Sequence, residues 1–324
     1  MRRSMSMCRG LVVLLALAGC QVRKEAPLRI GINPWPAWEY LYLAQEKGIF
    51  REEGLDVRLI EYTSLGDCCR AFERGQIDGM TCTLVELLRA RERSPREPQV
   101  VLVTDYSNGG DVVLARSPIS RISELRGKRV GVETASLGTY VLSRALATDG
   151  LTLDDVTIVP LDQLDLEAAI ANDEVDAVVS YPPVSVEILR AGEASPLFSS
   201  AQIPGEILDV VAIDADVIAR RGEDVARLAR GWERAKEFAR EQPAAADVRM
   251  ASREGLSVEE FRESLALIHI YSLADQRELL GPGGPVEATI RMTDSILRAA
   301  GEIRGPSRVA SAIAPTSTAG IAAR

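Results

Sequence analysis

Histidine and lysine are scarce in this chain of 324 residues, which contains one histidine, His269, and four lysines. A catalytic triad or a histidine-rich zinc site needs well-placed histidines, so any such site would have to include His269. The flanking run Leu265-Ala266-Leu267-Ile268-His269-Ile270-Tyr271 reads as an apolar helix, which favours a structural role for His269. We therefore predict neither a bound metal nor another cofactor.

Basic charge is also deficient, because 38 lysines and arginines stand against 47 aspartates and glutamates and leave a net charge of −9. This balance argues against nucleic acid as the main partner, since neutralising phosphates requires a basic surface. The composition, with 46% hydrophobic and 26% charged residues, is typical of a folded globular protein. The length suggests two domains, and beyond the N-terminal region no apolar run approaches the roughly 20 residues that span a membrane.

The N-terminal region reads as an export signal. Three arginines precede the apolar residues 11–19, which are too few to span a bilayer and end in small side chains. The sequence Leu17-Ala18-Gly19-Cys20 resembles the lipobox of bacterial lipoproteins, which implies a signal peptide over 1–19, acylation of Cys20 and a tether over 20–27. The implied location is a bacterial membrane, with the protein facing the periplasm or the cell exterior. Because Gln21 replaces the aspartate of inner-membrane retention, the retaining membrane stays open, as does a plain signal peptide.

Three cysteines, Cys68, Cys69 and Cys82, follow the export signal. Export permits a disulfide, but a bridge between the adjacent Cys68 and Cys69 would be strained. Either one of them pairs with Cys82 or all three are buried as small apolar side chains, and the sequence leaves both alternatives open. A reactive thiolate at Cys68-Cys69 would need a basic partner, and Arg70 is the one nearby, so we predict no enzymatic activity.

Beyond residue 27, strand-like and helix-like segments alternate in two successive units, which indicates an α/β fold with two mainly parallel sheets flanked by helices. The expected strands are 28–32, 56–62, 100–104, 130–132, 156–160 and 208–213. From residue 216 onward the pattern is helical, with expected helices at 225–242, 244–254, 257–270, 272–280 and 285–303. Residues 305–324 are rich in alanine, serine and threonine and are predicted to form a flexible tail.

Three segments match, in order and spacing, the motifs of one group of solute-binding proteins. Ala44-Gln45-Glu46-Lys47-Gly48-Ile49-Phe50-Arg51-Glu52-Glu53-Gly54-Leu55-Asp56-Val57 resembles the run A-x-x-K-G-[FIL]-F-x-x-x-G-L-x-V. Gly75-Gln76-Ile77-Asp78 resembles G-x-[IV]-D, and Leu125-Arg126-Gly127-Lys128-Arg129-Val130-Gly131-Val132 resembles L-[KR]-G-K-x-[IV]-[AG]-V. Together they resemble the NMT1/THI5-like family, which handles nitrate, sulfonates, taurine and thiamine precursors, over residues 28–213.

The resemblance implies a periplasmic-binding-protein fold of the second type, in which a solute sits in the cleft between two lobes. Lobe 1 is expected over 28–112 plus 210–304, and lobe 2 over 113–209. By analogy, the crossings between the lobes fall near 111–115 and 208–213. Hinge closure of the lobes around the solute is the motion typical of this class.

Candidate solute-binding residues follow the expected strands, because ligands of open α/β sheets bind beyond the carboxyl ends of strands. Several have another interpretation: either Trp35 or Trp38 packs in the core, Ser64 and Ser136 are helix caps, and Tyr181 and Asp209 serve a rigid turn and a hinge. The predicted ligand-binding residues are Trp35, Trp38, Ser64, Asp67, Thr81, Thr83, Tyr106, Glu133, Ser136, Thr139, Tyr181 and Asp209.

The predicted cleft segments carry acidic and aromatic side chains and neither arginine nor lysine, which favours a pyrimidine-like or amine-like solute over an oxoanion. The resemblance implies a monomer that captures its solute by lobe closure and delivers it to an ABC permease. Two alternatives stay open, namely a ligand-sensing lipoprotein with a membrane signalling partner and a binder of sulfonate-type or nitrate-type anions.

Overall fold

The computed structural model describes residues 26–134, 136–306 and 308–315. The predicted signal peptide over 1–19, Cys20 and residues 21–25 of the predicted tether lie outside the described residues. Across the described ranges, every helix is too short or too polar to pass through a bilayer.

One six-stranded sheet begins at the first described residues and is completed by two late strands. Its order is β11-β4-β10-β3-β1-β2, and β1 pairs in parallel with both β2 and β3. The two central strands β3 and β10 are buried at every residue, as expected where helices cover both faces of a sheet. The strands are β1 (Leu28–Ile32), β2 (Val57–Glu61), β3 (Gly79–Thr83), β4 (Pro98–Ser107), β10 (Leu208–Asp214) and β11 (Ile268–Ile270).

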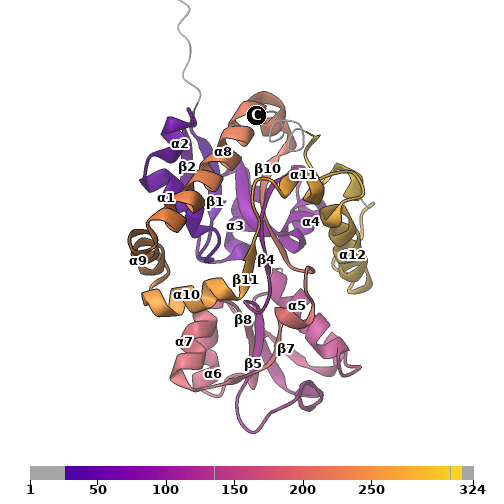
Figure 1. The fold of residues 1–324 in the computed structure, drawn as a ribbon. Helices are drawn as coiled ribbons and strands as arrows, with labels where there is room; N and C mark the ends of the chain where they lie inside the picture. The colour runs from indigo at the N-terminus through magenta and orange to yellow at the C-terminus, as the bar shows by residue number, and fades with distance from the viewer. Residues whose placement is uncertain (1–25, 135, 307, 316–324) are drawn as a thin grey trace, which may run out of the picture.

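A second, five-stranded sheet is formed from the middle of the chain in the order β7-β6-β8-β5-β9. Figure 1 shows the two sheets in separate lobes, one above the other. The strands are β5 (Val112–Ala115), β6 (Arg129–Val132), β7 (Thr157–Pro160), β8 (Ala177–Ser180) and β9 (Ser195–Ser199).

Both sheets are mixed, and the prediction of mainly parallel sheets is wrong in this respect. Strand β10 runs antiparallel to β3 and β4, and β11 runs antiparallel to β4. In the second sheet, β5 runs antiparallel to β8 and β9. The reason is that β5 and β10 directly follow the passages between lobes and so enter each sheet against the direction of its parallel strands.

The helices that position the cleft begin with side-chain caps. Ser64 accepts a hydrogen bond from the backbone N–H of Asp67 at the start of α3, and Thr83 and Glu86 form a capping box at the start of α4. The helices are α1 (Glu39–Glu46), α2 (Ile49–Glu52), α3 (Leu65–Glu73), α4 (Leu84–Arg93), α5 (Leu137–Ala147), α6 (Leu166–Ala171), α7 (Val184–Ala191), α8 (Ala215–Glu241), α9 (Pro243–Glu254), α10 (Val258–Ala266), α11 (Gln276–Leu279) and α12 (Pro285–Ala299).

The chain passes from the first sheet to the second over residues 108–111 and returns over 200–207, next to the crossings expected at 111–115 and 208–213. The two passages are hydrogen bonded to each other. The hydroxyls of Ser107 and Ser200 lie 2.7 Å apart, and the backbone N–H of Ser200 donates to the carbonyl of Asp111 at 2.8 Å. These bonds hold the two crossings side by side as one hinge.

Two predictions for the C-terminal part are wrong. The helix expected over 257–270 ends at Ala266, and exposed His269 lies in β11, where it pairs with Tyr106. The flexible tail expected over 305–324 is instead packed at residues 308–315. Val100 donates its backbone N–H to the carbonyl of Ala312 at 2.8 Å, and the side chain of Val309 is buried. Residues 268–270 and 308–315 therefore bond to β4 at the edge of the sheet, although their composition predicts a helix and a flexible tail.

Close packing between α2 and α8 depends on a helical glycine. A Cβ atom at Gly231 would lie 2.5 Å from the ring of Phe50, which is closer than a van der Waals contact permits. Phe50 and the neighbouring Trp232 are both buried.

We predict that Gly231→Ala destabilises the protein by about 1–3 kcal/mol through overpacking, although alanine favours an exposed helix by about 1 kcal/mol over glycine. Urea unfolding followed by circular dichroism measures the change. In a Phe50→Leu background the same substitution should be neutral or stabilising. Equal destabilisation in both backgrounds would contradict the proposed contact.

Candidate functional site

A small enclosed cavity lies between the two lobes, next to the crossings. The open space within it is about 10 Å³, about enough for one water molecule, so a solute can enter only when the walls move apart. Its walls come from strand ends and helix starts, which is where α/β sheets bind ligands. The lining residues are Asn33, Trp35, Trp38, Leu65, Asp111, Leu137, Tyr181 and Asp209.

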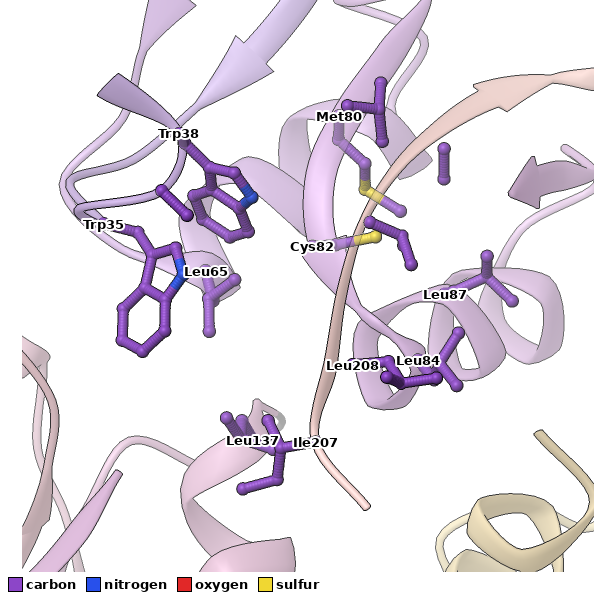
Figure 2. Packing of buried hydrophobic residues seen from close by; sticks show 14 of the residues in the cluster. Trp35, Trp38, Leu65, Met80, Cys82, Leu84, Leu87, Leu137, Ile207 and Leu208 are labelled. Carbon is purple, nitrogen blue, oxygen red and sulfur yellow. The ribbon is translucent and has the colours of Figure 1, made fainter. Parts of the chain in front are cut away.

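Three aromatic rings form much of the wall, and their polar groups are already bonded. The indole N–H of Trp35 donates to Asp105 at 3.1 Å, and that of Trp38 donates to Thr104 at 3.2 Å. The Trp35 ring meets Tyr181 of the second lobe edge-on, with centroids 6.2 Å apart. Figure 2 shows Trp35, Trp38 and Leu65 on one side and Leu137 on the other. With their N–H groups bonded to β4, the indoles offer the cavity an apolar, π-rich surface.

Buried carboxylates are concentrated around this cavity. Asp105 on β4 and Asp209 on β10 are register partners, and Asp111 lies in the first crossing. Burial raises the pKa of Asp105 to about 6 and that of Asp111 to about 7. Burial and the neighbouring Asp105 raise the pKa of Asp209 well above its ordinary range, so Asp209 holds the proton of this pair and donates it to Asp105. Within the described ranges, none of the three forms an ion pair with lysine or arginine.

Several acceptor atoms at the cavity have no hydrogen-bond donor. They are Asn33 Oδ1, Asp111 Oδ2 and Asp209 Oδ2, and all three side chains are at least nine-tenths buried. The Asn33 amide nitrogen is bonded to the carbonyl of Pro34, so its oxygen is the free end. A buried acceptor without a donor costs about 1–3 kcal/mol. The cavity is therefore chemically complementary to a molecule that carries hydrogen-bond donors.

Carboxylates of the chain itself lie at two helix starts beside the cavity, and at α3 one of them bonds to a backbone N–H group. Glu133 of the second lobe accepts from the backbone N–H of Gly66 at the start of α3, at 3.1 Å. Burial raises the pKa of Glu133 to about 7. At the start of α5, Ser136 donates through its hydroxyl to Glu86 at 3.0 Å. Because free N–H groups at helix starts are the common oxoanion site, Glu133 disfavours an oxoanion at the start of α3.

Arg89 is a buried basic residue near the cleft that the sequence analysis missed. Its guanidinium is 1% exposed and donates to the carbonyl of Ser136 at 2.5 Å and to the hydroxyl of Thr139 at 2.8 Å. It also pairs with Glu302. The charge of Arg89 is thus used to join α4 to the start of α5, across the two lobes.

The structure brings together some of the predicted ligand-binding residues. Trp35, Trp38, Tyr181 and Asp209 line the cavity. A second group lies at the contact between the lobes, next to the cavity, and consists of Ser64, Glu133, Ser136 and Thr139.

Four other predicted residues lie outside the cavity wall. Thr81 is buried within β3, and Thr83 caps α4. Asp67 is partly exposed and pairs with Arg70 at 2.7 Å. Tyr106 stacks on His269, with ring centroids 4.9 Å apart.

The sequence analysis missed Asn33, Leu65, Asp111 and Leu137 as cavity residues. Asn33 and Leu65 belong to segments that follow expected strands, so position alone could have found them. Asp111 was placed only at a crossing. Leu137 is an apolar residue in a helix start and gave no signal.

The three cysteines are free and buried, which agrees with the alternative of small apolar side chains. Burial raises the pKa of Cys68, Cys69 and Cys82 above the ordinary thiol range. The thiols are therefore protonated at neutral pH, and the idea of a reactive thiolate at Cys68-Cys69 is wrong.

Comparison with known proteins identifies relatives in sequence and in fold. The family described as NMT1/THI5 like matches residues 35–246. A 4-amino-5-hydroxymethyl-2-methylpyrimidine phosphate synthase of Aspergillus parasiticus is 27% identical over 66% of this chain and 67% of its own length. A protein of Brucella abortus (strain 2308), provisionally named a binding protein, is 24% identical over 72% of this chain and 73% of its own length.

Solved structures share the arrangement of the two lobes. The alkanesulfonate-binding protein SsuA of Xanthomonas axonopodis pv. citri, solved bound to MOPS, aligns with a TM-score of 0.75. The alignment covers 90% of this chain and 98% of that protein at 20% identity. The prediction of a two-lobed periplasmic-binding-protein fold of the second type is confirmed.

We predict that acidification stabilises the protein between pH 7 and pH 5, because Asp111 is protonated in the folded state below about pH 7 and ionised in the unfolded chain above about pH 4. One such proton contributes about 1.4 kcal/mol per pH unit within this window, and the stability is lost as the pH rises through 7. Urea unfolding of Asp111→Asn should show a smaller pH slope than the wild type.

Asp67→Asn is the matched control for this measurement. Hydrogen bonds from Thr63 and Arg70 lower the pKa of Asp67, so this carboxylate is ionised in both states above pH 5. Its removal should leave the slope unchanged. An unchanged slope in Asp111→Asn would contradict the protonated state of Asp111.

Proposed function

The chain belongs to the NMT1/THI5-like family, and on that premise we propose that it captures a small organic solute between its lobes for an ABC importer. The observation that carries the proposal is the buried cavity at the crossings, where aromatic rings surround acceptors that lack donors. The wall has the character of a small-molecule site, mostly apolar with a few convergent polar groups, and separation of the lobes would give it the volume of one.

Lobe closure is the mechanism that this arrangement supports. The proposed lobe 1 comprises 28–112 plus 210–304, and lobe 2 comprises 113–209. Contacts between them include the backbone N–H of Gly66 with Glu133, the Arg89 guanidinium with Ser136, and Trp35 with Tyr181. A solute shifts the equilibrium toward the closed form only if it contacts both lobes better there, and the cavity wall is drawn from both.

Delivery to a membrane permease completes the proposed role. The lipobox at Cys20 would hold the protein at a bacterial membrane surface, where a monomer with a closed cleft can dock onto the permease. No chemical step is required of the chain. A family relative is named as a synthase, but in this chain the cavity wall holds no histidine and the three thiols are buried and protonated.

The solute class follows from the polar groups of the cavity. Free acceptors on Asn33, Asp111 and Asp209 require donors, which amines and aminopyrimidines supply and which sulfonate and nitrate lack. The name of the Aspergillus relative refers to an aminopyrimidine, which supports the same class. The sulfonate named for the Xanthomonas neighbour is the alternative that the experiment must exclude.

We predict that 4-amino-5-hydroxymethyl-2-methylpyrimidine or a small amine raises the thermal midpoint of the purified protein, and that ethanesulfonate and nitrate, which carry no hydrogen-bond donor, do not. A ligand that binds only the folded state must raise the midpoint. A shift with sulfonates alone would refute the solute class, and no shift with any compound would count against solute capture.

Trp35→Ala should weaken binding of the active compound by about 10-fold or more, because one aromatic wall is removed. Tyr106→Ala is the matched control, since Tyr106 is an aromatic residue of the same lobe that lies outside the cavity wall. Isothermal titration measures both affinities. Equal losses in the two variants would point to a general structural effect and not to a binding site.

A further inference from the structure

We propose that the solute is an organic cation, a protonated nitrogen compound whose N–H groups bond to Asn33, Asp111 and Asp209, and that its capture releases protons from the carboxyl groups of the cavity. This inference rests on the proposed function and specifies the charge of the solute. Two independent features of the site carry it, an acidic cluster without a basic counterpart and free acceptor atoms that face the cavity.

The free acceptors point to a ligand independently of the charge. Asn33 is a neutral side chain that lines the cavity; it is 1% exposed, and its Oδ1 has no donor. Asp111 Oδ2 and Asp209 Oδ2 are in the same situation and lie on the two crossings or directly after them. An atom that has lost its water and found no partner is satisfied only by an incoming donor.

Five carboxyl groups from different parts of the fold lie around the cavity. Glu86 comes from α4, Asp105 from β4, Asp209 from β10, Asp111 from the first crossing and Glu133 from the second lobe. Tyr181, Tyr271 and Cys82 are the neutral titratable groups in electrostatic contact with them.

The positive groups nearby are Arg70 and Arg89, and both have other partners. Arg70 acts on Glu133 from α3 while it pairs with Asp67. Arg89 is bonded to Ser136, Thr139 and Glu302. The acidic cluster therefore lacks the cation that would let its members ionise together.

Protons take the place of that missing cation. Burial raises the pKa of Asp111 and of Glu133 to about 7, and the proton of Asp209 bonds to Asp105. When a cation enters, its charge favours the ionised carboxylates, so one or more protons leave to solvent as the ligand binds. Each proton that leaves compensates for one positive charge that enters the site. The affinity for the cation must therefore rise with pH over the range in which the free site still holds its protons.

Aromatic walls and the hinge position suit a cation as well. The indole N–H groups of Trp35 and Trp38 are bonded to β4, which leaves ring surface for a cation–π contact. The backbone of Asp111 is bonded to Ser107 and Ser200, the residues that join the two crossings. A cation bound to Asp111 thus lies directly at the crossings between the lobes.

Isothermal titration with charge-matched probes tests the inference on the purified protein. The probes are benzamidinium and its neutral counterpart benzamide, ethylammonium and its counterpart ethanesulfonate, and 4-amino-5-hydroxymethyl-2-methylpyrimidine. We expect binding by cations and none by benzamide or ethanesulfonate. The affinity should rise by about fivefold from pH 6 to pH 7 for one proton released from a group with a pKa of about 7, and level off above about pH 8. The binding heat should differ between phosphate and HEPES buffers, which take up the released proton with different enthalpies.

Asp111→Asn and Asp209→Asn should each weaken cation binding by about 10-fold or more, and Asp111→Asn should also reduce its pH dependence. Asp67→Asn, a carboxylate of the same lobe outside the cavity wall, should change neither. A circular dichroism melt of each variant checks that it is folded.

The outcomes separate this inference from the proposed function. Binding by benzamide, the neutral pyrimidine or ethanesulfonate without binding by any cation refutes the cation and leaves solute capture in place. Cation binding that is independent of pH and buffer refutes the proton release. Failure of every probe to bind refutes the cation and counts against solute capture itself.

Discussion

The burial of carboxyl groups without basic partners is the constraint on which the cleft depends. Asp105, Asp111, Glu133 and Asp209 lie where the lobes meet, and burial raises the pKa of each. Apolar side chains at these positions would stabilise the folded protein more than buried carboxyl groups do, so the carboxyl groups indicate a role other than stability. The cavity that they surround also contains acceptors without donors. A ligand that brings donors offsets the cost of these unpaired acceptors and the cost of burying the carboxyl groups.

Contact between the lobes is polar, and this suits a protein that must open and close. The starts of α3 and α5 meet Glu133 and Glu86 of the opposite lobe, and Arg89 reaches across to Ser136. Polar contacts can be exchanged for water when the lobes separate, at a small net free-energy change. Apolar contact at the cavity comes from the aromatic rings and from Leu65 and Leu137. The closed form is thus stabilised modestly, which leaves room for a solute to shift the equilibrium.

Family and fold leave the chemistry of the chain undetermined. The relatives compared include a synthase and a binding protein by name, and one fold commonly hosts unrelated functions. The distinction lies in individual side chains of this chain. Its one histidine, His269, stacks on Tyr106 at the sheet edge and not in the cavity wall, while Cys68 and Cys69 are buried and protonated. Aromatic rings and carboxyl groups line the cavity, and they fit the proposed role of binding a solute.

Local patterns in the sequence were sufficient for the α/β class, the strands near 28–32 and 208–213, and the aromatic and acidic character of the cleft, because periodicity and strand-end position are encoded in neighbouring residues. Tertiary structure decided the rest. The run around His269 joined β4 as a strand since short apolar runs suit either state, and Arg89 and Asp111 reached the cleft only through folding. Proton affinity and unpaired acceptors likewise depend on burial among distant side chains, which no local pattern contains.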